Sequence, residues 1–284
     1  MAINTASMQK LKLLFSILIS LLSTSFVGMG QNMVKIKEAK PLAIGEKLTV
    51  FSEYLKEDRV LNVYLPHGYS PDSSKVYPVI YLLDGSMHED FLHIVGIVQF
   101  GSYSWINFIP ESIVVGISNV DRKRDFTFPN KRQAKQKQSR HSGQFIAFID
   151  HELIPLINSR YKTTSESTVI GQSLGGLLAT EILIRKPHVF TNYIIISPSL
   201  WWDNSALLKE DPVYCLSKKK IYIAVGKEGR IMEQSAKVLY ENLIELNRPS
   251  LTVYYEYFDE LDHSNILHLG VYKAFQAVFK PVKS

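Results

Sequence analysis

The sequence predicts an α/β fold, in which a mostly parallel central sheet is covered by helices on both faces. Three observations lead to this prediction. Residues 79–83 and 112–117 are apolar throughout, as is typical of strands buried on both faces. Segments with apolar residues at helical spacing, such as residues 145–161, alternate with these strands. The chain contains no internal repeat and no linker rich in Pro or Gly, so one domain is expected.

The elements follow one another along the chain in a regular way. Residues 47–54 and 59–65 have the pattern of an opening hairpin. The strand at residues 251–258 has apolar residues at period two, and a closing helix follows it. The other predicted strands are 79–83, 112–117, 167–170, 193–196 and 221–225, and the predicted helices are 145–161, 174–186, 232–246 and 268–279.

A short turn between the strand at 167–170 and the next helix carries the strongest chemical signal. It reads Gly171-Gln172-Ser173-Leu174-Gly175, a Gly-x-Ser-x-Gly pattern in a strand–turn–helix context. Small residues are needed there because the turn is sharp and the serine backbone is strained. The turn also places Ser173 at a helix N-terminus, where free N–H groups can stabilise an oxyanion. Ser173 is therefore predicted to be a nucleophile, although the pattern also occurs by chance in loops.

A serine hydroxyl is a weak nucleophile, so it requires a base. Three of the eight histidines follow Ser173, namely His188, His263 and His268. His188 ends the helix that leaves the nucleophile, and His268 lies inside the last helix. His263 lies in the loop after the last strand, from which a base can reach a serine at a strand end. We therefore expect His263 to be the base.

The acid that orients the base is less well specified. Glu228, in the loop after the strand at 221–225, precedes His263 in the chain and is the first candidate. The alternative interpretation of Glu228 is a surface carboxylate. Asp203 is the second candidate, and a Ser–His dyad that uses a backbone carbonyl is a further alternative. The weaker candidates are Glu233, Asp259 and Asp262.

Two N–H groups must face the developing oxyanion. The first is expected to be the backbone N–H of Leu174, the residue after the nucleophile. The second is expected in the loop after the strand at 79–83, and we assign it to the backbone N–H of Ser86. With these donors the set of roles required for acyl transfer is complete.

Several segments resemble one family of esterases, which includes esterase D (S-formylglutathione hydrolase), feruloyl and acetyl-sugar esterases, and the enterochelin-type siderophore esterases. The resemblance covers about residues 47–279. Its motifs are Tyr77-Pro78-Val79-Ile80-Tyr81-Leu82-Leu83-Asp84-Gly85, Phe148-Ile149-Asp150-His151-Glu152-Leu153-Ile154-Pro155, the Ser173 turn and Ser197-Pro198-Ser199-Leu200-Trp201-Trp202. The last is similar to a segment of the siderophore-esterase branch. The resemblance implies an α/β-hydrolase fold without a large lid domain, and hydrolysis of carboxylic esters without a cofactor.

The loops around the turn contain the candidates for substrate binding. Residues 121–140 hold eight Lys and Arg against two Asp, which indicates either a solvated loop or a landing site for an anionic substrate. The resemblance singles out Arg122 and its neighbours, including Arg124, although Asp125-Phe126-Thr127-Phe128-Pro129 has one residue more than related esterases before the proline. Trp201 and Trp202 are candidates for an aromatic or acyl pocket. Adjacent tryptophans cannot both point inward, so one is expected to line the pocket and the other to cover the sheet edge.

The first 30 residues have the order of a secretory signal peptide. Lys10 and Lys12 precede an apolar run at residues 13–22, and Gly28 and Gly30 supply small residues. Cleavage is expected after Gly30, with Ser25 as an alternative site, which leaves residues 31–284 as a single domain in the periplasm or outside the cell. The run is short for a membrane span, and an uncleaved N-terminal anchor is the competing interpretation.

Composition excludes several other classes of protein. Removal of Lys10 and Lys12 lowers the net charge from +5 to +3, which gives no reason to expect nucleic-acid binding. Cys215 is the one cysteine, so an intrachain disulfide cannot form. His88 and His93 are five residues apart and lie off one helical face, so no metal site is predicted.

Together these observations predict a secreted serine esterase that forms an acyl-enzyme, needs no cofactor and acts on a small-molecule ester. The basic run and the Trp pair make an anionic aromatic ester, such as a catecholate siderophore, the first candidate substrate. A carbohydrate acyl ester is the alternative. A binding protein of the same fold without catalysis is the competing hypothesis from another class.

Overall fold

The computed structural model describes residues 8–10, 12, 34–130 and 141–279. The chain divides into two units, Met1–Leu42 and Ala43–Ser284, and the elements below belong to the second. The predicted cleavage site after Gly30 and most of the predicted signal peptide lie outside the described residues, so both stay predictions. None of the helices in the described ranges combines the length and apolarity that crossing a lipid bilayer requires.

The central sheet has eight strands in the order β1-β2-β4-β3-β5-β6-β7-β8. β1 and β2 form the predicted antiparallel hairpin, β2 is antiparallel to β4, and all later pairings are parallel. The strands are β1 (Gly45–Ser52), β2 (Glu57–Tyr64), β3 (Tyr77–Leu82), β4 (Ile113–Ile117), β5 (Thr163–Gln172), β6 (Asn192–Ile196), β7 (Lys219–Gly226) and β8 (Leu251–Phe258).

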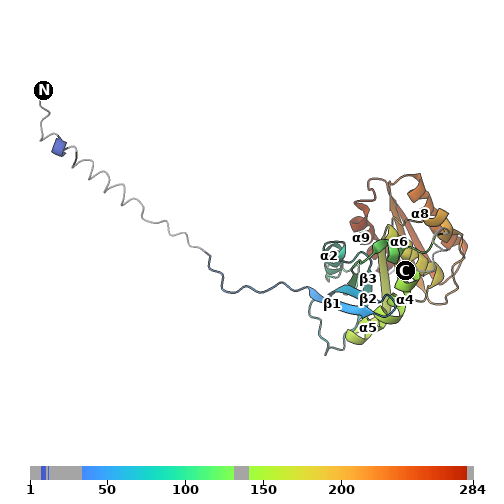
Figure 1. Ribbon diagram of the computed structural model, residues 1–284, viewed down its shortest axis with the longest axis horizontal. Coiled ribbons are helices and arrows are strands. Elements are labelled where there is room, and N and C mark those ends of the chain that lie inside the picture. The colour runs from blue at the N-terminus through green and yellow to red at the C-terminus, as the bar shows by residue number, and fades with distance from the viewer. Residues whose placement is uncertain (1–7, 11, 13–33, 131–140, 280–284) are drawn as a thin grey trace, which may run out of the picture. The chain divides into compact units, whose positions relative to one another are not determined.

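Helices cover both faces of the sheet (Figure 1). One face packs against α2 (Phe91–Gly101) and α9 (Ile266–Phe279) through a core that includes Ile80, Ile194 and Phe275. The other face carries a larger core that includes Tyr81, Val169 and Tyr193. The helical segments on this second side are α3 (Arg122–Phe126), α4 (Ser142–Phe148), η2 (Ile149–Leu153), α5 (Ile154–Arg160), α6 (Leu174–Arg185), α7 (Trp202–Ser205), η3 (Ala206–Lys209) and α8 (Arg230–Glu245).

The predicted α/β fold is confirmed, and the described residues contain no lid domain. The predicted helix at 145–161 is continuous but consists of α4, a π-helical turn (η2) and α5. Helix α2 was absent from the predicted elements. Its buried positions include Phe91, Ile94, Val95 and Val98, which have helical spacing. The helical period of this segment is thus present in the sequence.

The turn between β5 and α6 depends on close contact between main-chain atoms. Ser173 has φ 59° and ψ −118°, a backbone conformation that L residues rarely adopt. A Cβ at Gly171 would lie 2.4 Å from the carbonyl group of Gly175, and one at Gly176 would lie 3.0 Å from the carbonyl oxygen of Ile196. At Gly175 the nearest contact would be 3.3 Å, from Asp84. The strict steric demand therefore falls on Gly171, where the strand meets the helix.

Replacement of Gly171 by Ala is expected to lower the free energy of unfolding by at least about 2 kcal/mol, because main-chain atoms must move to accept the methyl group. Gly96 provides the matched control, because a Cβ there meets nothing within 4 Å in the middle of α2. Gly96→Ala should raise the free energy of unfolding by about 0.5–1 kcal/mol. Denaturant unfolding of both variants measures the difference, and equal stability of Gly171→Ala and wild type would contradict the steric argument.

Candidate active site

Ser173 lies at the carboxyl end of β5, at the first turn of α6. Its N–H donates to the carbonyl of Ile196 at 3.1 Å, and its own carbonyl accepts from the N–H of Ser199 at 3.0 Å. These two bonds hold the Ser173 backbone against the end of β6. Leu174 is the first residue of α6, so its N–H has no acceptor within the helix. The geometry gives a fixed hydroxyl next to a helix N-terminus, as an acyl-transfer site requires.

His263 and Glu228 come from two loops that lie against each other. His263 Nδ1 is 2.6 Å from Glu228 Oε2. Glu228 follows β7, and His263 lies between β8 and α9. The N–H of Lys227 donates to the carbonyl of Leu261 at 2.6 Å, so the backbones of the two loops are directly joined. A Cβ at Gly226 would lie 2.5 Å from the same carbonyl oxygen, so only glycine allows this approach.

The Glu228 carboxylate is buried, with 3% of its side chain exposed, yet both oxygens have donors. Oε1 accepts from the hydroxyl of Ser197 and, at 2.9 Å, from the N–H of Gly226. Burial acts to raise the pKa of Glu228, but the hydrogen bonds from His263, Ser197 and Gly226 outweigh it and hold the pKa below its usual value. Glu228 is therefore ionised at neutral pH.

The charge of Glu228 acts on the imidazole. The hydrogen bond to Glu228 raises the pKa of His263 above its usual 6.5, against the opposing effect of burial and of the Arg122 charge. The Gln172 side-chain amide donates to the carbonyl of His263 at 2.6 Å, which ties the histidine loop to the residue before Ser173. An oriented imidazole with an ionised partner can act as a general base.

Ser173 and His263 line the same two cavities. The first, of about 520 Å³, is also lined by Ser199, Trp201 and Met232. The Ser199 hydroxyl lies 3.3 Å from that of Ser173. Trp201 is exposed and forms an aromatic wall, whereas the indole N–H of Trp202 donates to the carbonyl of Phe128 at 3.0 Å and its ring packs on the core. Trp201 thus lines the site, as expected of one of the two tryptophans, whereas Trp202 lines neither cavity and packs on the core.

The second cavity, of about 400 Å³, has a charged wall formed by Arg122, Asp84, Glu89 and Asp90. Arg122 makes two hydrogen bonds to Asp84, at 2.6 and 2.8 Å, and a third to the carbonyl of Gln172 at 3.3 Å. Burial, reinforced by the charge of Asp84, raises the pKa of Asp90 to about 6. Arg122 therefore lines a cavity that Ser173 and His263 also line, but a carboxylate neutralises it and two more lie beside it, so its role in substrate binding stays a prediction.

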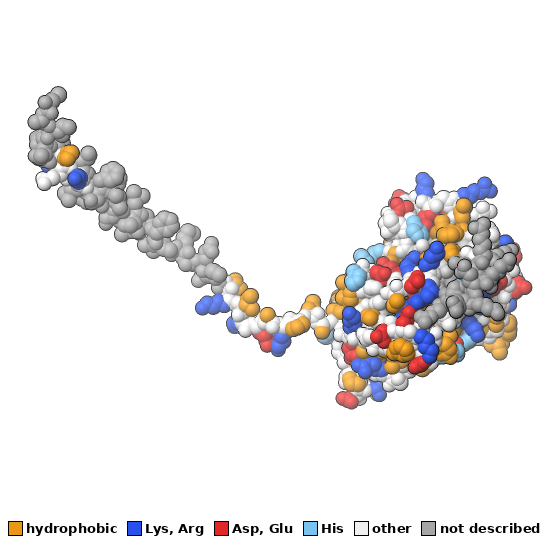
Figure 2. Space-filling view, viewed as in Figure 1, with side chains coloured by type: hydrophobic (Ala, Val, Ile, Leu, Met, Phe, Trp, Pro, Cys, Tyr) orange, Lys and Arg blue, Asp and Glu red, His pale blue; other side chains and the backbone are white. Residues whose placement is uncertain are grey.

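Arg124 does not reach the site. Its guanidinium binds Glu57 at 2.5 and 2.9 Å and Asp125 at 2.7 Å, and 18% of its side chain is exposed. Asp125 also pairs with the buried Arg59 at 2.7 Å. The structure therefore does not place Arg124 at the site as predicted: it lines neither cavity, and its charge compensates the carboxylates of Glu57 and Asp125 between β2 and α3. Residues 131–140 of the predicted basic loop lie outside the described residues. On the face shown in Figure 2, basic side chains alternate with acidic ones.

Ser86 differs from its predicted role as an oxyanion donor. Its N–H donates to Glu89 Oε2 at 3.1 Å, and its hydroxyl donates to the same oxygen at 2.5 Å. The side-chain amide of Asn119 holds this group of acids together, with 2.6 Å to Asp84 and 3.0 Å to Glu89. The Ser86 N–H is thus engaged by a carboxylate in this structure, because Ser86 and Glu89 close a turn in which the Glu89 N–H also donates to the Ser86 carbonyl at 3.1 Å.

Of the candidate acids, Glu228 is the one that pairs with His263. Asp203 lies in a turn with φ 48° and does not line either cavity. Within the part of the chain that the structure describes, no three His, Cys, Asp or Glu side chains converge as a metal site would require. Sequence reasoning missed Ser197, Ser199, Gln172 and Asp84. The first two belong to the Ser197-Pro198-Ser199 segment, which signalled a resemblance without indicating a role.

Comparisons with known proteins agree with this geometry. The family model described as "Putative esterase" matches residues 52–264. The ferri-bacillibactin esterase BesA of Bacillus subtilis is 29% identical over 251 residues, which are 79% of this chain and 86% of that protein. An IroE-like serine hydrolase from Shewanella oneidensis superposes with a TM-score of 0.72 at 29% identity, covering 82% of this chain and 79% of the other.

A more distant structure shares the fold. The siderophore hydrolase EstA from Aspergillus nidulans has a TM-score of 0.70 at 18% identity, covering 87% of this chain and 98% of its own. The family match spans most of the chain and includes β2 to β8, the Ser173 turn and the His263 loop. This chain therefore belongs to the "Putative esterase" family, and it is an ester hydrolase with the α/β-hydrolase fold.

Proposed function

We propose that this protein is a secreted or periplasmic serine esterase that works through an acyl-enzyme and acts on siderophore-type esters. The observation that carries the mechanism is the 2.6 Å contact between His263 and a buried, ionised Glu228, in a cavity that Ser173 also lines. The predicted N-terminal leader supports export from the cytoplasm. Conversion of Ser173 to Ala, described below, is the test of the mechanism.

In this mechanism His263 removes the proton from Ser173 as its oxygen attacks the ester carbonyl, and Glu228 stabilises the imidazolium that forms. The same proton then passes to the leaving alcohol. Water attacks the acyl-enzyme and His263 takes its proton. The bond from the acyl carbon to Ser173 Oγ then breaks, His263 returns the proton to Oγ, and the carboxylic acid product leaves. The hydrogen bond from the Gln172 side chain to the His263 carbonyl ties the histidine loop to the turn that carries Ser173.

The oxyanion would be stabilised by the N–H of Leu174 at the start of α6. A second donor in the loop after β3 would be the N–H of Ser86, provided that it exchanges the Glu89 carboxylate for the oxyanion.

The choice of siderophore-type esters is supported by the two cavities. Trp201 offers an aromatic wall next to Ser173, against which an aryl group can pack. The names of the ferri-bacillibactin esterase and of EstA indicate siderophore substrates for those proteins. The acidic side of the second cavity favours the neutral or cationic part of a substrate, so an anionic catecholate would lie on the Trp201 side. A carbohydrate acyl ester is the alternative that the same substrate tests can reveal.

Ser173→Ala is expected to abolish hydrolysis of p-nitrophenyl butyrate, lowering kcat by about 10³-fold or more, because no other hydroxyl occupies the turn. A fluorophosphonate probe should label wild type and fail to label the variant. Ser199→Ala is the matched control, because the Ser199 hydroxyl lies 3.3 Å from that of Ser173. The probe should still label this variant, since it reacts with Ser173 and not with Ser199. Unchanged hydrolysis by Ser173→Ala would refute the mechanism, and an unlabelled, inactive wild type would favour a non-catalytic ligand-binding protein.

The rate should depend on pH through His263, which must be neutral to accept a proton. Since its pKa is raised above 6.5, the acid limb of kcat/KM should have its midpoint above pH 6.5. Glu228→Gln removes the charge that raises this pKa, so the midpoint should move toward 6.5 and kcat should fall by about 10²-fold or more.

Asp259→Asn serves as the control for Glu228→Gln, because Asp259 lies just after β8 and lines neither cavity. It should leave both the midpoint and kcat close to wild type. If Asp259→Asn instead reproduced the Glu228→Gln profile, or if Glu228→Gln kept the wild-type midpoint, then Glu228 would not be the acid.

Trp201→Ala should lower kcat/KM for ferric enterobactin by about tenfold or more, since an aromatic anchor is lost, while kcat/KM for p-nitrophenyl acetate changes less. Phe51→Ala, an exposed aromatic on β1 that lines neither cavity, is the control for surface truncation. Side-by-side assays with acetylated xylan and methyl ferulate complete the test. If either of these esters is cleaved faster than ferric enterobactin, the substrates of this protein would be carbohydrate acyl esters.

A further inference from the structure

A large cavity lies at the opposite end of the sheet from Ser173. It has a volume of about 680 Å³, within the range of about 300–1,000 Å³ in which small ligands are bound. Its lining includes Tyr64, the last residue of β2, and Ser112, which precedes β4. β2 is antiparallel to β4, β4 is parallel to β3, and β3 is parallel to β5. The end of β2 and the start of β4 therefore lie at the opposite end of the sheet from the carboxyl end of β5, where the Ser173 turn begins. We call it the Trp105 cavity.

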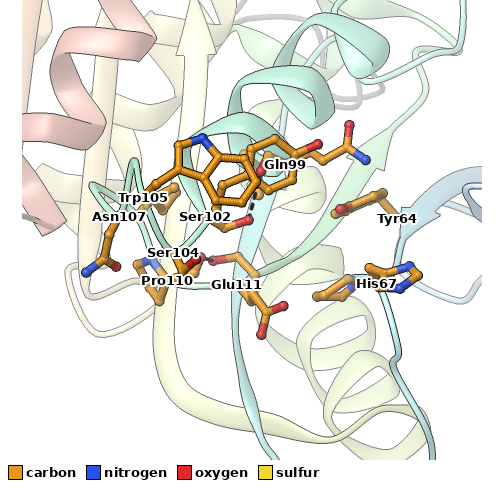
Figure 3. A pocket seen from close by; sticks show the side chains of 14 residues that line it. Tyr64, His67, Gln99, Ser102, Ser104, Trp105, Asn107, Pro110 and Glu111 are labelled. Carbon is orange, nitrogen blue, oxygen red and sulfur yellow. Dashed lines mark hydrogen bonds between the residues drawn. The ribbon is translucent and has the colours of Figure 1, made fainter.

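A stacked pair of aromatic rings forms one wall of the Trp105 cavity. The rings of Tyr103 and Trp105 have centroids 4.7 Å apart and planes inclined by 18°. Trp105 is 76% exposed, so a large, flat apolar surface faces solvent. In the view of Figure 3, the Trp105 indole lies on one side and Tyr64 and His67 on the other, with the Glu111 carboxylate between them. An exposed tryptophan held in this way is suited to contact a ligand with a flat face.

The loop that carries the aromatic pair is anchored to the core. The N–H groups of Ile106 and Asn107 donate to the carbonyl of Tyr103, both at 2.8 Å, and the N–H of Phe108 donates to that of Gly101 at 3.1 Å. The ring of Phe108 is buried against Tyr272 of α9, with centroids 4.8 Å apart. The aromatic wall is thus prepared for binding before a ligand arrives, which lowers the entropy cost of binding.

Neutral polar groups surround this wall. Tyr64, Gln99, Ser104 and Asn107 line the cavity, and within the described ranges their side chains form no hydrogen bond to another residue. Burial raises the pKa of Tyr64, with further contributions from Glu111 and Tyr103, so its hydroxyl remains a donor at neutral pH. Glu111 is the one Asp, Glu, Lys or Arg in the lining, and Lys75 pairs with it. The site therefore offers hydroxyl and amide groups without an excess of positive charge.

We propose that the Trp105 cavity binds the sugar units of a neutral glycan, at a site separate from the ester-hydrolysing residues. A pyranose ring presents an apolar C–H face, which can stack on Trp105, and a rim of hydroxyls, which Gln99, Asn107 and Tyr64 can bind. An anionic ligand would meet the Glu111 carboxylate, and a wholly apolar ligand would leave these polar groups without partners. The proposal does not rest on the esterase function, because the two sites lie at opposite ends of the sheet.

Binding of neutral hexasaccharides to the full-length protein tests this proposal. Isothermal titration with cellohexaose, maltohexaose, xylohexaose, mannohexaose and chitohexaose should show saturable binding of at least one. Trp105→Ala should weaken that binding by about tenfold or more, as truncation of an aromatic anchor does, and Trp105→Phe should weaken it less. Tyr214→Ala removes an aromatic side chain of similar exposure outside the cavity and should leave the affinity unchanged. Melting temperatures verify that each variant is folded.

The outcomes separate the sources of the sugar. If the protein sediments with insoluble cellulose, xylan, mannan or chitin and Trp105→Ala does not, the ligand is the surface of a polymer. If only hexasaccharides bind, the ligand is a free oligosaccharide. Absence of binding to every glycan, or equal binding by wild type and Trp105→Ala, would overturn the proposal. So would binding of 2,3-dihydroxybenzoate in the cavity without binding of any glycan, because the ligand would then be an aromatic acid.

Discussion

The buried carboxylate of Glu228 imposes the constraint on which the active site depends. An ionised group with 3% of its side chain exposed is unfavourable unless donors surround it, and here three donors from three places in the chain do so. Ser197 follows β6, Gly226 ends β7 and His263 follows β8. Satisfying one charge therefore fixes the relative positions of the loops at the carboxyl ends of three adjacent strands. The orientation of the imidazole follows from that arrangement.

The backbone at these strand ends is correspondingly strained and tightly packed. Ser173 and Ser197 both have positive φ, at 59° and 43°, and both follow directly on a buried strand. The N–H of Ser173 bonds to the last residue of β6, and the N–H of Ser197 bonds to Ala224 of β7. Each turn is thus held by a hydrogen bond to the neighbouring strand, and these bonds to the sheet stabilise the strained backbone. The parallel strand order, which places these ends side by side, is what makes the site possible.

Much of this could be predicted from the sequence because the signals are local. The continuous apolar strands, the Gly171 turn and the position of His263 after the last strand depend on short-range patterns. Pairings over long sequence separations were not visible. Arg124 pairs with Glu57, 67 residues apart, which takes its guanidinium away from the site. Trp202 bonds to Phe128, 74 residues apart, and this decides which of the two tryptophans packs on the core. A charge or an indole N–H needs a partner, but the sequence does not say which one. Helix α2 is a different case, because the helical spacing of its apolar residues is present in the sequence.

The Arg122–Asp84 pair leaves the second cavity with more carboxylates than cations, and this has a bearing on turnover. Asp84, Glu89 and Asp90 face one guanidinium next to Ser173. Ester hydrolysis turns a neutral group into an acid that ionises at neutral pH, so the product acquires a negative charge beside this wall. Repulsion then acts on the product and not on the uncharged ester linkage from which it came. We therefore expect the charge that hydrolysis creates to favour release of the product.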